Sequence, residues 1–277
     1  MLGLSCCTCG AWLFVPIFLM ICAVSDGVRY RMKFVLFIIL SAISSSIFIP
    51  LMLFKIRHWS NALLPAWCVK NTGKILGVNF VIRGHENIVE DSGCVVLINH
   101  QSSIDLCVLG ELWSVLKRGT VIAKKEILFF GTFGLAAWLW GTIFIDRSNG
   151  PEARGKMNVT SESIKKLKAK VFLFPEGKRH SNKSLMPFKK GAFHVAIAAQ
   201  TPIQPVVVSR YYFLNDKKKT FDSGTSYITI LPPIPTEGLT KEDIPSLIEK
   251  AYEIMNNKFI ETSQEALNAH MKMLTSQ

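Results

Sequence analysis

The sequence predicts an α/β fold, with a mainly parallel sheet flanked by helices and a helical membrane anchor at the N-terminus. Short apolar runs alternate along most of the chain with segments whose apolar residues recur at helical spacing. This alternation is typical of a parallel sheet covered on both faces. Two long uncharged runs precede it. With 277 residues the chain can bury one sizeable core besides an anchor, but not a second full domain.

The anchor is predicted from the uncharged runs at residues 2–25 and 34–54, each long enough to cross about 30 Å of hydrocarbon as a helix. We therefore expect residues 1–57 to form a membrane anchor of two hydrophobic helices and residues 58–277 to form the folded domain. A cleaved signal peptide is the alternative for the first run, since residues 23–25 resemble a cleavage site, although no basic residue precedes that run.

Apolar and helical segments then follow in a regular order. A helix is expected over residues 59–74, and the apolar run at 78–82 predicts the first strand. Further strands are expected near residues 94–99, 120–124, 142–147, 171–175, 203–209 and 226–231. Further helices are expected near residues 104–116, 152–169, 189–200 and 241–267. The uncharged stretch 127–145 contains three glycines and ends in β-branched residues, which predicts an interfacial helix that runs into a strand.

The last of these helices has the clearest pattern. Thr240 and Asp243 are placed to cap its N-terminus. Its apolar residues recur at helical spacing: Ile244, Leu247, Ile248, Ala251, Ile254, Met255 and Phe259.

Charge and composition narrow the class of partner. The formal net charge of +12 favours nucleic acid, an anionic bilayer or phosphorylated substrates. Because 49% of the residues are hydrophobic and no zinc-finger, KH or RRM pattern occurs, we expect a membrane protein with no nucleic-acid partner. The seven cysteines form no paired CxxC motif, which favours a reduced cytosolic domain. Cys6, Cys7 and Cys9 are either small anchor residues or palmitoylation sites.

The segment Asn99 to Asp105, with the sequence NHQSSID, follows the apolar run 94–98 directly. His100 thus leaves the carboxyl end of a predicted strand, two serines are placed to cap the next helix, and Asp105 falls in its first turn. Positions five apart on one helix diverge by roughly 140°, so a contact between His100 and Asp105 requires this strand-to-helix corner. The carboxylate would fix the imidazole tautomer and leave the other nitrogen to take a proton from a hydroxyl.

Two other histidines compete for this role. His194 falls in an amphipathic helix, and His180 falls in a polar loop without a carboxylate at a similar spacing. We therefore predict His100 as the base.

A second polar cluster, Glu176 to Arg179, ends the predicted strand at 171–175. Gly177 would let the backbone approach a ligand, and Arg179 can donate two hydrogen bonds to a phosphate. Glu176 would repel a phosphate, so we expect it to orient Arg179 or to accept a substrate hydroxyl. Arg147, which closes the strand expected near 142–147, is the second phosphate candidate. The alternatives are a solvated basic turn for the first site and a surface cluster with Asp146 for the second.

These segments resemble the motifs of the glycerolipid acyltransferases. NHQSSID resembles their NHxxxxD motif, GTIFIDR (141–147) their second motif, FPEGKR (174–179) their FPEGTR motif, and PIQP (202–205) with VVV (206–208) their proline motif. The resemblance covers roughly residues 60–260 and is nearest to the members that acylate 1-acylglycerol 3-phosphate. Lys178 departs from the usual threonine, which bears on how tightly the acceptor phosphate is held.

The resemblance implies a membrane enzyme of phospholipid biosynthesis, located in the endoplasmic reticulum with residues 58–277 as a catalytic domain facing the cytosol. It would move an acyl chain from acyl-CoA to the sn-2 hydroxyl of lysophosphatidic acid, giving phosphatidic acid and CoA. Its partners would be these two substrates and membrane lipids. No Gly-rich phosphate loop, paired metal-ligand motif or GxSxG elbow occurs, so we expect no cofactor and no metal.

The residue roles follow from the same resemblance. His100 would be the general base held by Asp105, and Arg179 with Arg147 and Lys178 would clamp the acceptor phosphate. Transfer would be direct, without an acyl-enzyme. Backbone N–H groups at the helix start after His100 are candidates for an oxyanion hole. Residues 129–140 would help to line an apolar groove for the acyl chain. Pro205 either shapes a cavity wall or is an ordinary edge-strand proline.

Two other functions stay open. A glycerol-3-phosphate or other lysophospholipid acyltransferase would share the base and differ in the acceptor pocket. A catalytically silent, membrane-shaping lipid-binding scaffold would keep the fold alone, and the intact pair of His100 and Asp105 argues against it.

Overall fold

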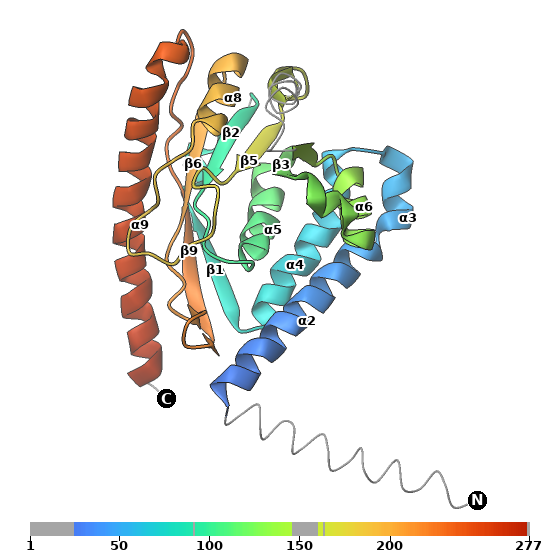
Figure 1. Ribbon diagram of the computed structural model, residues 1–277, viewed down its shortest axis with the longest axis vertical. Helices are drawn as coiled ribbons and strands as arrows, with labels where there is room; N and C mark the ends of the chain where they lie inside the picture. Colours follow the sequence, from blue (N-terminus) through green and yellow to red (C-terminus); the bar gives the residue numbers. More distant parts are fainter. Residues whose placement is uncertain (1–24, 91, 146–159, 163, 276–277) are drawn as a thin grey trace, which may run out of the picture.

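A seven-stranded sheet with helices on both faces forms the centre of the molecule (Figure 1). The computed structural model describes residues 25–90, 92–145, 160–162 and 164–275. In spatial order the strands are β1 (Val78–Arg83), β9 (Gly224–Ile230), β6 (Ile203–Val208), β2 (Cys94–Ile98), β5 (Lys170–Leu173), β3 (Gly119–Lys124) and β4 (Ile143–Ile145).

Strand directions confirm the predicted mainly parallel sheet. β6, β2, β5, β3 and β4 pair in parallel. β9 is antiparallel to β6, and β1 pairs in parallel with β9 at the edge of the sheet. A short hairpin of β7 (Leu214–Asn215) and β8 (Thr220–Phe221), which the sequence analysis missed, follows β6.

Strand β2 is covered on both faces of the sheet, since all five of its residues are buried. Val96 and Ile98 point to one face and join a core cluster with α4 (Leu63–Ile75) and α5 (Asp105–Leu116). Val95 and Leu97 point to the other face and join a cluster with α8 (Gly191–Ala199) and α9 (Ile244–Thr275). A continuous apolar run is therefore required here, since neither face meets water.

The predicted helices are present with shifted ends. The helix expected over 59–74 is a 3-10 turn (Trp59–Ala62) followed by α4. Before α9, the backbone N–H of Thr240 donates to Asp243 Oδ2 at 2.7 Å, as the predicted cap requires. Within the helix expected over 152–169, the described residues 160–162 and 164–167 are helical, whereas residues 168–169 are not.

The first described helix, α2 (Asp26–Ser46), packs against α4, β8 and α6 (Gly131–Leu139) (Figure 1). The short helix α3 (Ile49–Met52) follows it. Pro50 lacks the N–H that would bond the carbonyl of residue 46, so the uncharged run 34–54 does not form one straight helix as expected. By length and composition, no single described helix suits a membrane crossing, and α2 with Ile49–Lys55 does so only as a pair bent by 42°. The first predicted span lies almost wholly outside the described residues.

Candidate active site

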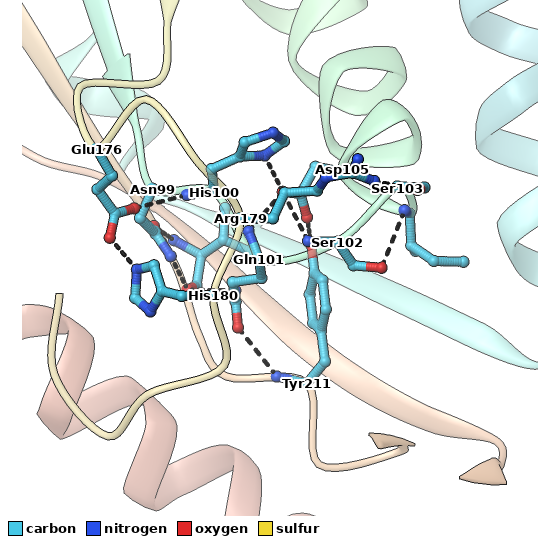
Figure 2. A network of polar contacts seen from close by, with 12 residues as sticks. Asn99, His100, Gln101, Ser102, Ser103, Asp105, Glu176, Arg179, His180 and Tyr211 are labelled. Atoms are coloured by element: carbon cyan, nitrogen blue, oxygen red, sulfur yellow. Dashed lines mark hydrogen bonds and ion pairs between the residues drawn. The ribbon is translucent and has the colours of Figure 1, made fainter. Parts of the chain in front are cut away.

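The site lies at the corner between β2 and α5, where the chain turns at Asn99 (Figure 2). The side-chain amide of Asn99 donates to the carbonyl of Val208 at 3.0 Å, and its oxygen accepts from the N–H of Val208 at 2.7 Å. The amide therefore continues the ladder between β2 and β6 by one step and fixes where the strand ends. This anchoring places His100 at the carboxyl edge of the sheet.

His100 and Asp105 meet as the spacing predicts. His100 Nδ1 lies 2.7 Å from Asp105 Oδ2, and the same oxygen accepts the backbone N–H groups of Gln101 at 2.7 Å and Ser102 at 3.2 Å. The carboxylate is buried, whereas the His100 side chain is 24% exposed and borders the cavity described below. With Nδ1 donating to Asp105, Nε2 carries the free lone pair and suits proton abstraction.

One local expectation about this corner is wrong, and another is narrowed. The serines do not cap α5, since its N-cap position is Ile104, and the Ser102 hydroxyl reaches only the N–H of Ile104 at 3.5 Å. The N–H groups of Gln101 and Ser102 are taken by Asp105, so the prediction of oxyanion donors at the helix start after His100 remains only for the N–H groups that follow them. Asp105 itself satisfies the donors of this turn because its side chain folds back over it.

Two rings hold the pair in place. Phe174 stacks on the imidazole of His100, with ring centroids 4.0 Å apart and 22° between the planes. The hydroxyl of Tyr211 donates to Asp105 Oδ1 at 2.7 Å. Burial, with a further contribution from Asp105, raises the pKa of Tyr211 well above its usual value, so the phenol stays protonated. Sequence reasoning missed Tyr211. Its only signal is its position three residues beyond the end of β6, which pairs with β2.

Glu176 is buried, and its contacts differ from those expected. Its Oε1 accepts the backbone N–H of His100 at 2.8 Å, and its Oε2 accepts the N–H of Met186 at 2.8 Å and contacts the Nε2 of His180. These donors, rather than Arg179, satisfy the carboxylate. The expectation that His180 has no nearby carboxylate is likewise wrong, because Glu176 lies four residues before it.

The turn after Glu176 carries the basic side chains. Gly177 has φ +72, a left-handed conformation that favours glycine. Lys178 and Arg179 are exposed and border the same cavity as His100. Arg179 Nη1 donates to the hydroxyl of Ser103 at 2.5 Å, which ties this turn to the corner that carries His100.

An apolar cavity of about 700 Å³ leads away from His100. It runs between the sheet and the helices α2, α4, α5 and α6. Phe133, Ala137 and Trp140 contribute to its wall, as expected for residues 129–140. Its polar end holds His100, Lys124, Lys178 and Arg179, and three serines of α2 line it as well, namely Ser41, Ser44 and Ser45.

Other predicted residues do not join this cavity. Pro205 lies inside β6, between β9 and β2, so it is not an edge-strand proline and does not line the cavity. The ladder between β6 and β9 begins at Val206, so the missing N–H of Pro205 falls just outside it. His194 lies in α8, away from the cavity lining. Arg147 lies outside the described residues. Within the described ranges, no group of His, Cys, Asp and Glu could hold a metal ion.

Comparison with known proteins agrees with this geometry. Residues 79–209, which contain His100, Asp105 and the basic turn, match the family model "Acyltransferase". The human 1-acyl-sn-glycerol-3-phosphate acyltransferase alpha is 38% identical over 218 residues, covering 78% of this chain and 76% of that protein. The human beta protein is 39% identical over 209 residues, covering 75% and 74%. The chain belongs to this acyltransferase family.

The fold of this acyltransferase also has a solved counterpart. The crystal structure of PlsC, the 1-acyl-sn-glycerophosphate (LPA) acyltransferase of Thermotoga maritima, superposes with a TM-score of 0.62 over 84% of this chain and 98% of that chain. At 18% identity this likeness concerns the fold alone. The yeast 1-acyl-sn-glycerol-3-phosphate acyltransferase is 38% identical over 196 residues, covering 69% of this chain and 64% of that protein.

Proposed function

We propose that the protein transfers an acyl group from acyl-CoA to the sn-2 hydroxyl of 1-acyl-sn-glycerol 3-phosphate, giving phosphatidic acid and CoA. The observation that carries this proposal is the His100 and Asp105 pair, 2.7 Å apart at the polar end of an apolar cavity. The printed names of the human and yeast relatives support the acceptor, since each describes action on 1-acyl-sn-glycerol 3-phosphate.

In the proposed reaction, His100 Nε2 removes the proton of the acceptor hydroxyl as its oxygen attacks the thioester carbonyl. The carbon–sulfur bond then breaks, and the proton passes from the imidazolium to the CoA thiolate. Asp105 stabilises the imidazolium during this step. General-base catalysis of this kind typically raises the rate by about 10²- to 10⁴-fold. No cofactor or metal enters the scheme.

Substrate binding is proposed from the two ends of the cavity. Lys178 and Arg179 at the polar end suit the acceptor phosphate, because a guanidinium can donate two parallel hydrogen bonds to it. Arg147 is kept as a further candidate for this role. A cavity of about 700 Å³ with an apolar wall suits an acyl chain.

Membrane attachment is proposed from exposed apolar side chains on the same side of the sheet as the cavity. Phe54, Phe129 and Phe130 are 85%, 75% and 65% exposed. Ile38 and Ile43 of α2 and Ile47, directly after it, are more than half exposed. Such a surface suits the boundary of a bilayer, from which the lipid substrate would come. We keep the endoplasmic reticulum, a cytosolic catalytic domain and an N-terminal anchor as parts of this proposal.

The test uses the full-length protein in lipid nanodiscs with radiolabelled acyl-CoA and a panel of acceptors. We expect phosphatidic acid from lysophosphatidic acid, loss of product with His100→Ala, and little transfer to glycerol 3-phosphate or to lysophospholipids with larger headgroups. Preferred use of another acceptor would replace the substrate assignment. Failure to consume the thioester with any acceptor would favour a lipid-binding scaffold.

A further inference from the structure

The Asp105 carboxylate is satisfied on both oxygens from different parts of the chain. Oδ2 faces His100 and two backbone N–H groups of its own turn, whereas Oδ1 accepts the Tyr211 hydroxyl at 2.7 Å. Tyr211 lies outside the four recognised motifs. Without it, Oδ1 would lose its only side-chain donor among the described residues.

The ring of Tyr211 is fixed by its neighbours, so its hydroxyl has a defined position. Phe213 stacks on it with ring centroids 5.3 Å apart, and Phe80 of β1 meets it edge-on at 6.1 Å. The backbone N–H of Tyr211 donates to the side chain of Gln101 at 3.3 Å. The residue is buried, so its hydroxyl is shielded from bulk water.

We propose that Tyr211 is a positioning residue for His100: it holds the Asp105 carboxylate in place and lowers the proton affinity of the histidine by sharing the carboxylate charge. This inference rests on the proposed role of His100 as the base. It assigns to Tyr211 no contact with either substrate.

The sign of the effect follows from the hydrogen bond. A donor on Oδ1 draws charge away from the carboxylate, which weakens its hold on the imidazolium. When the phenol hydroxyl is removed, the charge on Asp105 is less dispersed and the pair of His100 and Asp105 binds a proton more tightly. Neutral His100, the form that acts as a base, then becomes predominant only at higher pH.

Other ionisable groups near His100 belong to different elements. Glu176 bonds to the His100 backbone, and His180 donates its backbone N–H to the His100 carbonyl at 3.1 Å. Cations that border the same cavity are Lys124, Lys178 and Arg179. Substituting Tyr211 leaves all of these in place, so a change in titration would report the hydroxyl itself.

The test compares Tyr211→Phe, which removes one oxygen and keeps the ring, with Tyr212→Phe. Tyr212 is half-buried, and its ring contacts the Arg210 guanidinium instead of Asp105. For Tyr211→Phe we expect kcat to fall roughly tenfold, with unchanged KM for both substrates, because only the alignment of the base is disturbed. The acid limb of the kcat profile should move up by roughly one pH unit. Tyr212→Phe should match the wild type.

A second readout does not depend on activity. Diethyl pyrocarbonate reacts with neutral imidazole, and peptide mass spectrometry can follow its reaction at His100 as a function of pH. In Tyr211→Phe, the midpoint of this reaction should shift upward with the acid limb. An unshifted midpoint in a folded variant would overturn the role of Tyr211, while His100 would remain the base. If His100→Ala kept its activity, the proposed function would fail instead, whatever Tyr211 did.

Discussion

The carboxylate of Glu176 accepts the backbone N–H of His100 at 2.8 Å, so the turn that carries Arg179 also fixes the peptide that carries the base. This hydrogen bond joins two segments that lie 76 residues apart in sequence. The Glu176 carboxylate also accepts the N–H of Met186 and contacts the His180 ring. Both of its oxygens are therefore engaged within the protein. The acidic residue of this motif is therefore best understood as part of the scaffold of the site.

Glu176→Gln should destabilise the fold as well as the site. The amide places an NH₂ group against donors that now meet a carboxylate, which costs about 2–3 kcal/mol for a buried group of this kind. Chemical denaturation would measure the loss. Glu249→Gln, on the exposed side of α9, is the matched control and should be neutral. Equal stability of Glu176→Gln and the wild type would contradict this account.

His100→Ala should remove catalysis with little effect on folding, because the side chain is partly exposed and serves the proposed transition state. We expect kcat to fall at least ~10²-fold, and Asp105→Asn to be similarly severe. Steady-state kinetics together with a thermal melt would check both. More than about a tenth of the wild-type kcat in the His100 variant would remove its assignment as the base.

Arg179→Ala should raise the KM for lysophosphatidic acid roughly tenfold while changing the KM for acyl-CoA little, because a charge-assisted contact to the acceptor phosphate is lost. Arg179→Lys should restore little, since an ammonium cannot donate the paired bonds of a guanidinium. Lys183→Ala, an exposed cation nearby, is the control. A selective rise in the KM for acyl-CoA would move this turn to the coenzyme A site.

Transfer should proceed without an acyl-enzyme. Burial, with contributions from Asp105 and Glu111, raises the pKa of Cys107 to about 12, so its thiol is protonated and unreactive near neutral pH. Ser102→Ala and Cys107→Ala should both keep substantial activity. Intact-mass spectrometry after mixing with acyl-CoA alone would detect an adduct. A stoichiometric acylated protein, lost in either variant, would overturn direct transfer.

Changing Phe54, Phe129 and Phe130 to serine should weaken liposome binding by about tenfold or more, because each exposed ring contributes apolar area to the membrane contact. Anionic lipid should strengthen binding, and high salt should reverse that gain. Co-sedimentation would measure both effects. The control is Met271→Ser with Leu274→Ser, exposed apolar residues on α9, across the sheet from α6 (Figure 1). Equal losses from both sets would contradict a defined membrane face.

The sequence alone predicted the features that depend on residues close together along the chain. The apolar run 94–98 had to be buried on both faces, and the five-residue spacing of His100 and Asp105 at a strand end brought them together. The contacts that it missed join distant segments. Tyr211 reaches Asp105 across 106 positions, and Glu176 reaches His100 across 76. Such contacts depend on which strands pair, and strand order is not visible in local periodicity.

The bend between α2 and α3 could not be predicted from the sequence. Pro50 breaks an apolar run that by composition reads as one span, and a proline in an apolar run does not reveal how far the chain will bend. The short hairpin at β7 and β8 was missed because its two-residue strands lie below the length at which alternation can be recognised.

Helix α2 separates two apolar environments. Ser41, Ser44 and Ser45 line the cavity, whereas Ile39 and Ile43, on the opposite side of the helix, are 48% and 54% exposed. A single helix, about 10 Å across, is therefore the partition between the interior chamber and the surroundings. Substitutions at inward-facing positions of α2 should change the volume of the cavity. Substitutions at outward-facing positions should change the outer surface that α2 presents to its surroundings.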